Sequence, residues 1–113
     1  MDQKEAKGLA NVLRTARETL GTDTTLLRLE TLLRIAAEEG QSQREIGEAM
    51  KVQKTTVSQN VLNLSVTGAY LQAGPGLVEQ QIDPMERRKK VLSITTKGQR
   101  LLEKFARNMR GRR

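Results

Sequence analysis

The sequence predicts a mainly α-helical fold with one small β-hairpin. Apolar residues recur at helical spacing over residues 1–67, the spacing changes to alternation over 77–94, and helical spacing returns over 95–110. A chain of 113 residues has the length of one domain, and we expect residues 1–113 to form a single core.

The first two helices are predicted from apolar stripes that end at glycines. A helix within residues 1–21 ends at Gly21, and a second helix follows the Thr22–Asp23–Thr24 cluster and ends before Gly40. The first stripe consists of Leu9, Val12, Leu13, Ala16 and Leu20. The second consists of Leu26, Leu29, Leu33 and Ala36, and is widened by Leu27 and Leu32. Its width places the second helix at the centre of the expected core.

Residues 42–67 are expected to form a helix-turn-helix. Ser42 and Glu45 have the spacing of a capping box, which predicts the start of a short third helix. Its buried side is expected to hold Ile46, Ala49 and Met50, and a fourth helix begins near Gln53. Apolar residues of the fourth helix are Val57, Val61 and Leu64, which leaves the polar residues Thr55, Thr56, Ser58, Gln59, Asn60 and Asn63 pointing away from the core.

The segment after Gly74–Pro75–Gly76 is predicted to be a hairpin followed by a last helix. Val78, Gln80 and Ile82 alternate with their neighbours, as Lys90, Leu92 and Ile94 do, on either side of a turn at Asp83–Pro84. Thr95 is the expected N-cap of a helix that buries Leu101, Leu102, Phe105 and Met109.

Composition excludes several kinds of chemistry. The chain has no Cys and no His, which excludes cysteine nucleophiles, structural zinc and histidine acid–base catalysis. We expect no enzyme activity, no metal and no cofactor. The N-terminal residues lack the apolar stretch of a secretory signal and no segment resembles a membrane span, so a cytoplasmic protein is expected.

Positive charge is concentrated in the second half of the chain. Residues 1–50 carry seven basic and nine acidic side chains, whereas 51–113 carry thirteen basic and four acidic ones, for a total of +7. Such an asymmetry indicates a polyanionic partner, with nucleic acid ahead of an anionic membrane surface.

The order of elements favours double-stranded DNA as that partner. The second helix of a helix-turn-helix can enter the major groove, and an arginine-tipped hairpin, or wing, can reach the adjacent minor groove. Amide side chains can pair with adenine edges, and hydroxyl groups can donate to bases or phosphates. The predicted DNA-binding residues are Gln53, Lys54, Thr55, Thr56, Ser58, Gln59, Asn60, Asn63, Arg87, Arg88, Lys89 and Lys90.

From Ser42 to about Phe105 the chain resembles a winged helix-turn-helix of the multiple-antibiotic-resistance regulator (MarR) family. SQREIGEAM resembles the first motif helix, KTTVSQNVLNL the recognition helix, and LVEQQIDPMERRKKVLSITTKGQRLLEKF the wing and the helix after it. The wing residues at the family's spacing are Asp83, Pro84, Arg87, Arg88, Ser93, Thr95, Lys97 and Gly98.

The resemblance implies roles for residues of the wing and the last helix. Arg88 would enter the minor groove, steadied by the acidic residue two positions earlier, which is Glu86 here where the family usually has Asp. Asp83 and Glu86 therefore form the expected wing brace. Gly98 would allow close packing in the first turn of the last helix.

The sequence departs from the family pattern at several points. Lys51 stands in the motif's turn where Gly is common, and Gly47 stands in the first motif helix where Ala is common. Residues 69–76 are an insertion before the wing, and we expect Tyr70 and Leu71 to anchor it on the core.

We also expect a homodimer formed through the N-terminal and last helices, because a twofold pair reads two half-sites. The sequence stops soon after the last helix, where the family usually continues into another helix. Only Tyr70 and Phe105 are aromatic, so a small-molecule effector is not expected.

The main functional hypothesis is a sequence-specific transcriptional regulator. The alternatives are a winged-helix adaptor that binds a protein of the transcription or replication machinery, and an architectural protein that binds DNA without sequence preference. Salt dependence and competition between duplexes distinguish these functions.

Overall fold

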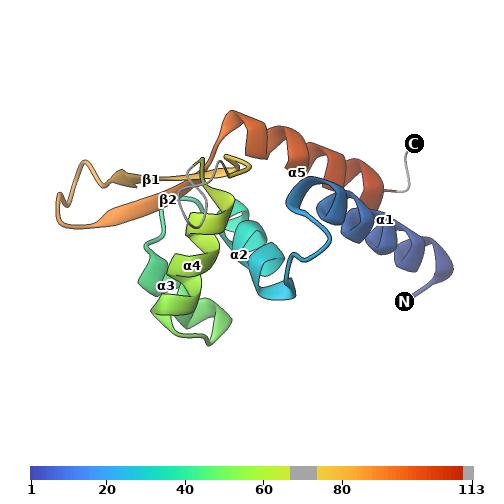
Figure 1. Ribbon diagram of the computed structural model, residues 1–113, viewed down its shortest axis with the longest axis horizontal. Helices are drawn as coiled ribbons and strands as arrows, with labels where there is room; N and C mark the ends of the chain where they lie inside the picture. The colour runs from blue at the N-terminus through green and yellow to red at the C-terminus, as the bar shows by residue number, and fades with distance from the viewer. Residues whose placement is uncertain (67–73, 111–113) are drawn as a thin grey trace.

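The structure is a computed structural model that describes residues 1–66 and 74–110. Within these ranges it contains five helices and one two-stranded antiparallel sheet (Figure 1), and none of the helices is long and apolar enough to cross a membrane. In chain order the elements are α1 (Gln3–Leu20), α2 (Leu26–Ala37), α3 (Gln43–Met50), α4 (Lys54–Leu64), β1 (Val78–Ile82), β2 (Lys90–Ile94) and α5 (Thr96–Met109). This is the mainly α-helical winged helix-turn-helix that the sequence predicts.

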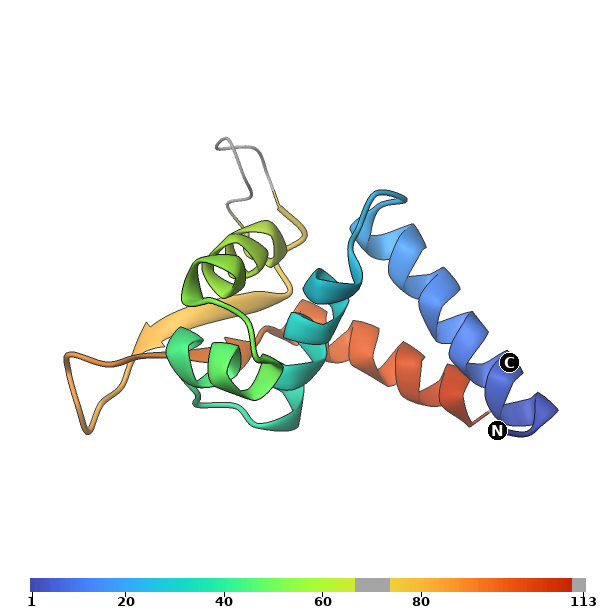
Figure 2. The same ribbon diagram turned by 90° about the horizontal axis from the view of Figure 1, so that it is seen from below.

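The elements form two groups, as Figures 1 and 2 show. Helices α2, α3 and α4 pack with the hairpin, whereas α5 leaves the hairpin and lies beside α1. The Asn108 side chain donates a hydrogen bond to the Thr15 hydroxyl at 2.8 Å and so joins α5 to α1. A Cβ at Gly8 would lie 2.9 Å from the Asn108 carbonyl oxygen, so glycine permits the close approach of the two helices.

The core lies mainly between α2, α4 and the hairpin. Leu32 of α2, Leu64 of α4 and Leu92 of β2 are completely buried, which confirms the central place of α2. The predicted buried face of α2 is wrong in part, because Leu26 and Leu33 are 79% and 41% exposed. Because leucines lie on most sides of α2, helical spacing alone is consistent with more than one buried face. The packing of the other elements buries the face that holds Leu32.

Helix α1 ends at Gly21 as predicted, but only part of its apolar stripe is covered. Val12 and Ala16 are buried, whereas Leu9 and Leu13 are 38% and 40% exposed. The physical reason is that α1 packs chiefly against the single helix α5, which covers a narrower stripe than a core on two sides would.

The helix-turn-helix forms with the predicted cap and a left-handed turn residue. Ser42 and Glu45 make both hydrogen bonds of the capping box. Lys51 has φ 60°, so lysine occupies the left-handed position where glycine is more favourable. The prediction that Ala49 is buried is wrong, because Ala49 is exposed. Gly47 is buried instead, and a Cβ at this position would lie 3.1 Å from the Val52 carbonyl oxygen.

After α4 the chain returns to the helix it has left. The Leu77 N–H donates to the Leu64 carbonyl oxygen at 2.7 Å, and the Gly74 N–H donates to that of Val66 at 2.6 Å. These bonds place the start of the wing against the end of α4. The predicted anchoring by Tyr70 and Leu71 lies outside the described residues.

The wing forms from the two predicted strands around the predicted turn. Val78 pairs with Ile94 and Ile82 with Lys90, and the Asp83 N–H donates to the Lys89 carbonyl oxygen. A two-stranded hairpin is marginal alone. Here β2 is also bonded to the segment between α2 and α3, through backbone hydrogen bonds that join Leu92 to residues 40 and 41.

Helix α5 begins as predicted and packs closely on the wing. The Thr95 hydroxyl accepts a hydrogen bond from the Gly98 N–H at 3.0 Å. A Cβ at Gly98 would lie 2.3 Å from the Leu77 carbonyl oxygen, which confirms that this position must lack a side chain. Phe105 is buried as predicted, but Met109 is 52% exposed and does not belong to the core.

Candidate nucleic-acid interface

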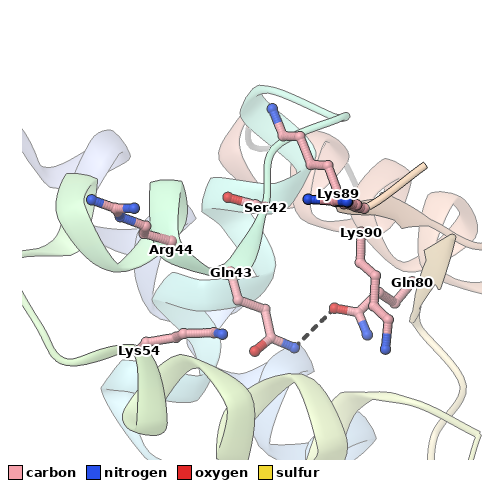
Figure 3. A pocket seen from close by; sticks show the side chains of 8 residues that line it. Ser42, Gln43, Arg44, Lys54, Gln80, Lys89 and Lys90 are labelled. Atoms are coloured by element: carbon pink, nitrogen blue, oxygen red, sulfur yellow. Dashed lines mark hydrogen bonds between the residues drawn. The ribbon is translucent and has the colours of Figure 1, made fainter. Parts of the chain in front are cut away.

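A polar groove separates the helix-turn-helix from the wing. It has a volume of about 490 Å³ and lies where the N-terminal turns of α3 and α4 face the hairpin (Figure 3). Its lining residues are Ser42, Gln43, Arg44, Lys54, Gln80, Arg88, Lys89 and Lys90. Five of these eight side chains are cationic and none is acidic, so the groove attracts anions.

Three of the five cations have no acidic partner within residues 1–66 and 74–110. These are Lys54, Arg88 and Lys90. Arg44 forms an ion pair with Glu48 at 3.2 Å, but both side chains are largely exposed, and such a pair stabilises the fold little. The groove therefore keeps most of its positive charge available to phosphate groups.

Lys89 has a structural partner on the helix-turn-helix. Its ammonium group lies 3.0 Å from Glu45 Oε1, the oxygen that also accepts the hydrogen bond from the Ser42 N–H. This contact raises the pKa of Lys89 above its ordinary value. One carboxylate thus caps α3 and holds the wing, and the predicted role of Lys89 as a phosphate contact competes with this ion pair.

Acid unfolding should report on Glu45. The hydrogen bonds from the Ser42 N–H and the Lys89 ammonium lower the pKa of Glu45 from 4.5 to about 2. Because the folded-state pKa is the lower one, the stabilisation is complete above pH 4.5 and is lost as the pH falls toward about 2. In thermal melts, Glu45→Gln should lower Tm at neutral pH. Between pH 4.5 and about 2, the Tm of this variant should fall less steeply with decreasing pH than the Tm of the wild type. Glu48→Gln is the matched control, and an equal decline for Glu45→Gln and wild type would contradict the assignment.

The exposed face of α4 holds most of the predicted contact residues. Gln53, Lys54, Thr55 and Gln59 are exposed, while Thr56, Ser58 and Asn63 are half-buried. The prediction that Asn60 points away from the core is wrong, because this residue is only 6% exposed. Asn60 lies three residues after the buried Val57 and one before Val61, so it falls on the apolar face of the helix.

The tip of the wing exposes Arg87 and Arg88. Asp83 braces the turn as an acceptor, since its Oδ1 takes a hydrogen bond from the Met85 N–H at 2.8 Å. The implied contact between Glu86 and Arg88 is wrong: the described residues contain no ion pair between them. Glu86 acts instead through its backbone carbonyl oxygen, which accepts from the Lys89 N–H at 2.9 Å.

Sequence reasoning missed four residues of the groove. The four are Ser42, Gln43, Arg44 and Gln80. Residue spacing predicts only that Ser42 caps a helix and that Gln80 lies in a strand. The signal was present in part, because residues at the start of α3 and on the hairpin must face each other if the wing folds back on the motif.

A second groove of about 450 Å³ lies beside α5, on the face that meets the end of α1. Buried Leu77 and Leu101 contribute to it, together with Thr19 and Glu103. The cations that line it are Lys97, Arg100, Lys104 and Arg107. None of these four forms an ion pair with another described residue. This site combines an apolar surface with unpaired positive charge.

The fold and the groove define a winged helix-turn-helix with a cationic surface between its second motif helix and its wing. No family model and no curated protein matches the chain. Solved structures do match it, and their similarity extends over almost the whole chain.

The matching structures are MarR-family regulators. The match to MepR in the S. aureus MepR–DNA complex covers 94% of this chain and 79% of the MepR chain, with 23% identity and a TM-score of 0.71. The match to MarR covers 91% of this chain and 73% of the MarR chain, with 25% identity and a TM-score of 0.63. The match to the PcaV transcriptional regulator from Streptomyces coelicolor, in complex with its natural ligand, covers 98% of this chain and 77% of the PcaV chain. The identity is 23% and the TM-score is 0.62. The chain therefore has the MarR-like winged-helix fold, as its wing motif indicates.

The comparison also corrects one expectation. PcaV has this fold and its structure holds a natural ligand. The expectation that a small-molecule effector is absent is therefore contradicted in part, because a protein of this fold holds a ligand.

Proposed function

We propose that this protein is a sequence-specific, double-stranded DNA-binding transcriptional regulator. The observation that carries the proposal is the groove between α4 and the wing, where five cationic side chains and no acidic one line the surface. In addition, the fold is shared with MepR, whose structure contains DNA, and with the regulator PcaV.

In this proposal α4 lies in the major groove and the wing reaches the minor groove. Arg87 and Arg88 at the wing tip suit the negative potential of a narrow minor groove. Lys54 and Lys90 would hold phosphates, which fixes register without reading sequence. The side chains proposed to contact bases or adjacent phosphates from α4 are Gln53, Thr55, Thr56, Ser58, Gln59 and Asn63.

The experiment is a selection of bound duplexes from a random pool, followed by salt titration with the selected sequence and a shuffled one. A specific regulator prefers the selected duplex by on the order of 1,000-fold or more at physiological salt. Equal affinity for both duplexes, with a steep salt dependence, would indicate architectural binding instead. Absence of binding at low salt would favour the protein-binding adaptor.

We propose a homodimer in which α1 and α5 form the interface. Leu9 and Leu13 lie one turn apart on α1 and are 38% and 40% exposed, and Met109 of α5 is 52% exposed. Burying such side chains stabilises association by about 1 kcal/mol or more each. The face of α5 that lines the second groove is disfavoured as a dimer interface. A twofold contact there would bring its four unpaired cations close to the same cations of the partner.

Charge on the α1 surface should separate the dimer. The variant Leu9→Glu/Leu13→Glu should raise the dimer dissociation constant by at least about 100-fold, because carboxylates would have to be desolvated in the interface. Sedimentation equilibrium measures this change. Leu62→Glu is the control, since Leu62 is equally exposed at 40% but lies on α4. A monomeric wild type at micromolar concentration would contradict the proposal.

We further propose that the second groove binds an anionic small molecule with an apolar body. The aliphatic stems of Lys97 and Arg107 would contact the apolar part, and Arg100 and Lys104 would pair with the anionic group. Aromatic carboxylates in a thermal-shift assay should raise Tm of the wild type. Arg100→Ala/Lys104→Ala should abolish the shift, whereas Lys4→Ala/Lys7→Ala should keep it. Equal shifts in both variants would mean that the compounds bind elsewhere.

A further inference from the structure

One side chain at the start of α3 joins the recognition helix to the wing. We infer that Gln43 is a positioning residue that couples base reading by α4 to minor-groove contact by the wing. The inference rests on the proposed function, and it assigns a mechanism that makes the two DNA contacts cooperative.

Gln43 makes a hydrogen bond in each direction. Its Oε1 accepts from the Ser58 hydroxyl of α4, and its Nε2 donates to Gln80 Oε1 of β1 at 3.0 Å. Figure 3 shows the Gln43 and Gln80 side chains meeting across the groove. Ser58 lies 15 residues from Gln43 and Gln80 lies 37 residues from it, so the bridge connects three separate elements.

The chemistry of the bridge requires an amide. A glutamine side chain offers an acceptor and a donor at the end of one flexible stem, so it can serve a hydroxyl and another amide together. Methionine has the same length without a donor, and its sulfur is a weak acceptor. Gln43→Met therefore removes the bridge and changes neither the charge nor the approximate volume of the groove.

The backbone of α3 holds Gln43 in place for this task. Gln43 is the first residue of α3 and directly follows the N-cap Ser42, whose capping box fixes the helix start. The Lys89–Glu45 pair joins the wing to the same helix, but it does not reach α4. Among the described hydrogen bonds, the one chain of side chains from α4 to the wing passes through Gln43.

The consequence for binding is preorganisation. Backbone hydrogen bonds to residues 40 and 41 hold Leu92 in the middle of β2, and Gln43 holds Gln80, the residue of β1 that pairs with Leu92. A wing fixed relative to α4 loses less conformational entropy when both engage DNA. Without the bridge, no side-chain hydrogen bond between described residues would hold the middle of β1 to α4, and the two DNA contacts would be coupled more weakly.

The test is a double-mutant cycle in two backgrounds. Gln59→Ala removes a contact of α4, Arg88→Ala removes one of the wing, and their combination is measured on the selected duplex. In the wild-type background the combined loss should differ from the product of the single losses by about threefold or more. In the Gln43→Met background the two losses should multiply to within about twofold.

The matched control is Gln81→Met. Gln81 is the neighbour of Gln80 in β1 and is exposed, and among the described residues its side chain bonds only to Glu79. This variant should retain the coupling. Undiminished coupling in Gln43→Met, or equal loss of coupling in Gln81→Met, would overturn the inference while specific binding by the wild type keeps the proposed function intact.

A measurement without DNA tests the bridge itself. Backbone amide order parameters of β1 should fall in Gln43→Met and stay unchanged in Gln81→Met, with Tm of both variants close to wild type. Unchanged order parameters would overturn the inference even if no duplex is bound specifically. If Gln43→Met does not fold, Gln80→Met removes the bond to β1 without changing a side chain proposed to contact DNA, and the same outcomes decide.

Discussion

Lys54→Glu/Lys90→Glu should lower the affinity for the selected duplex by about 100-fold and reduce the slope of log affinity against log salt by about 2. Both lysines line the groove and neither forms an ion pair with a described residue, so the substitutions disturb no internal contact of that kind. Lys54 is the first residue of α4, a position where the helix dipole favours a carboxylate. The variant should therefore fold normally and repel phosphates.

The control for this variant has the same change in net charge at another place. Lys4→Glu/Lys7→Glu also removes four units from the total of +7, but these residues lie on the exposed first turns of α1. Fluorescence anisotropy with a labelled duplex, over a range of salt concentrations, measures both variants. Equal losses would mean that net charge and not the groove governs binding, and the assigned surface would then be wrong.

Gly98→Ala should destabilise the fold more than alanine at any other helical glycine of the described residues. The new Cβ would lie 2.3 Å from the Leu77 carbonyl oxygen and 2.6 Å from Ile94 Cγ2, both of which belong to the packed junction of wing and α5. Relieving these contacts requires α5 to move away from the wing. We expect a loss of about 3 kcal/mol, seen as a fall in Tm of more than about 10 °C.

Gly47→Ala gives the comparison for that result. Gly47 is also a buried helical glycine, but its Cβ would lie 3.1 Å from the nearest oxygen, and alanine would gain up to about 1 kcal/mol in helix propensity. The two terms oppose each other, so Tm should change by only a few degrees. A fall in Tm for Gly98→Ala no larger than that for Gly47→Ala would contradict the packing argument.

Local signals made the elements of this fold predictable from sequence. The capping box at Ser42, the Thr95 cap and the alternation around Asp83–Pro84 each depend on residues that are close in the chain, and the structure confirms all three. Gly98 was also predictable, because the wing motif specifies a glycine at the site of closest packing.

What the sequence did not predict depends on contacts between distant residues. Leu26 and Leu32 are the same residue type on one apolar helix, and only the position of the other elements decides that Leu32 is buried. The contacts of Gln43 with Ser58 and Gln80 arise only after the wing folds back over the motif. Asn60 illustrates the same limit, since a polar residue on an apolar face has no distinguishing pattern.

The hydrogen bonds between Gly74 and Val66 and between Leu77 and Leu64 join the start of the wing directly to the end of α4. The spacing of α4 and the wing is thus set by main-chain contacts, so substitutions of the exposed Val66 side chain should leave both proposed DNA-contacting elements in place.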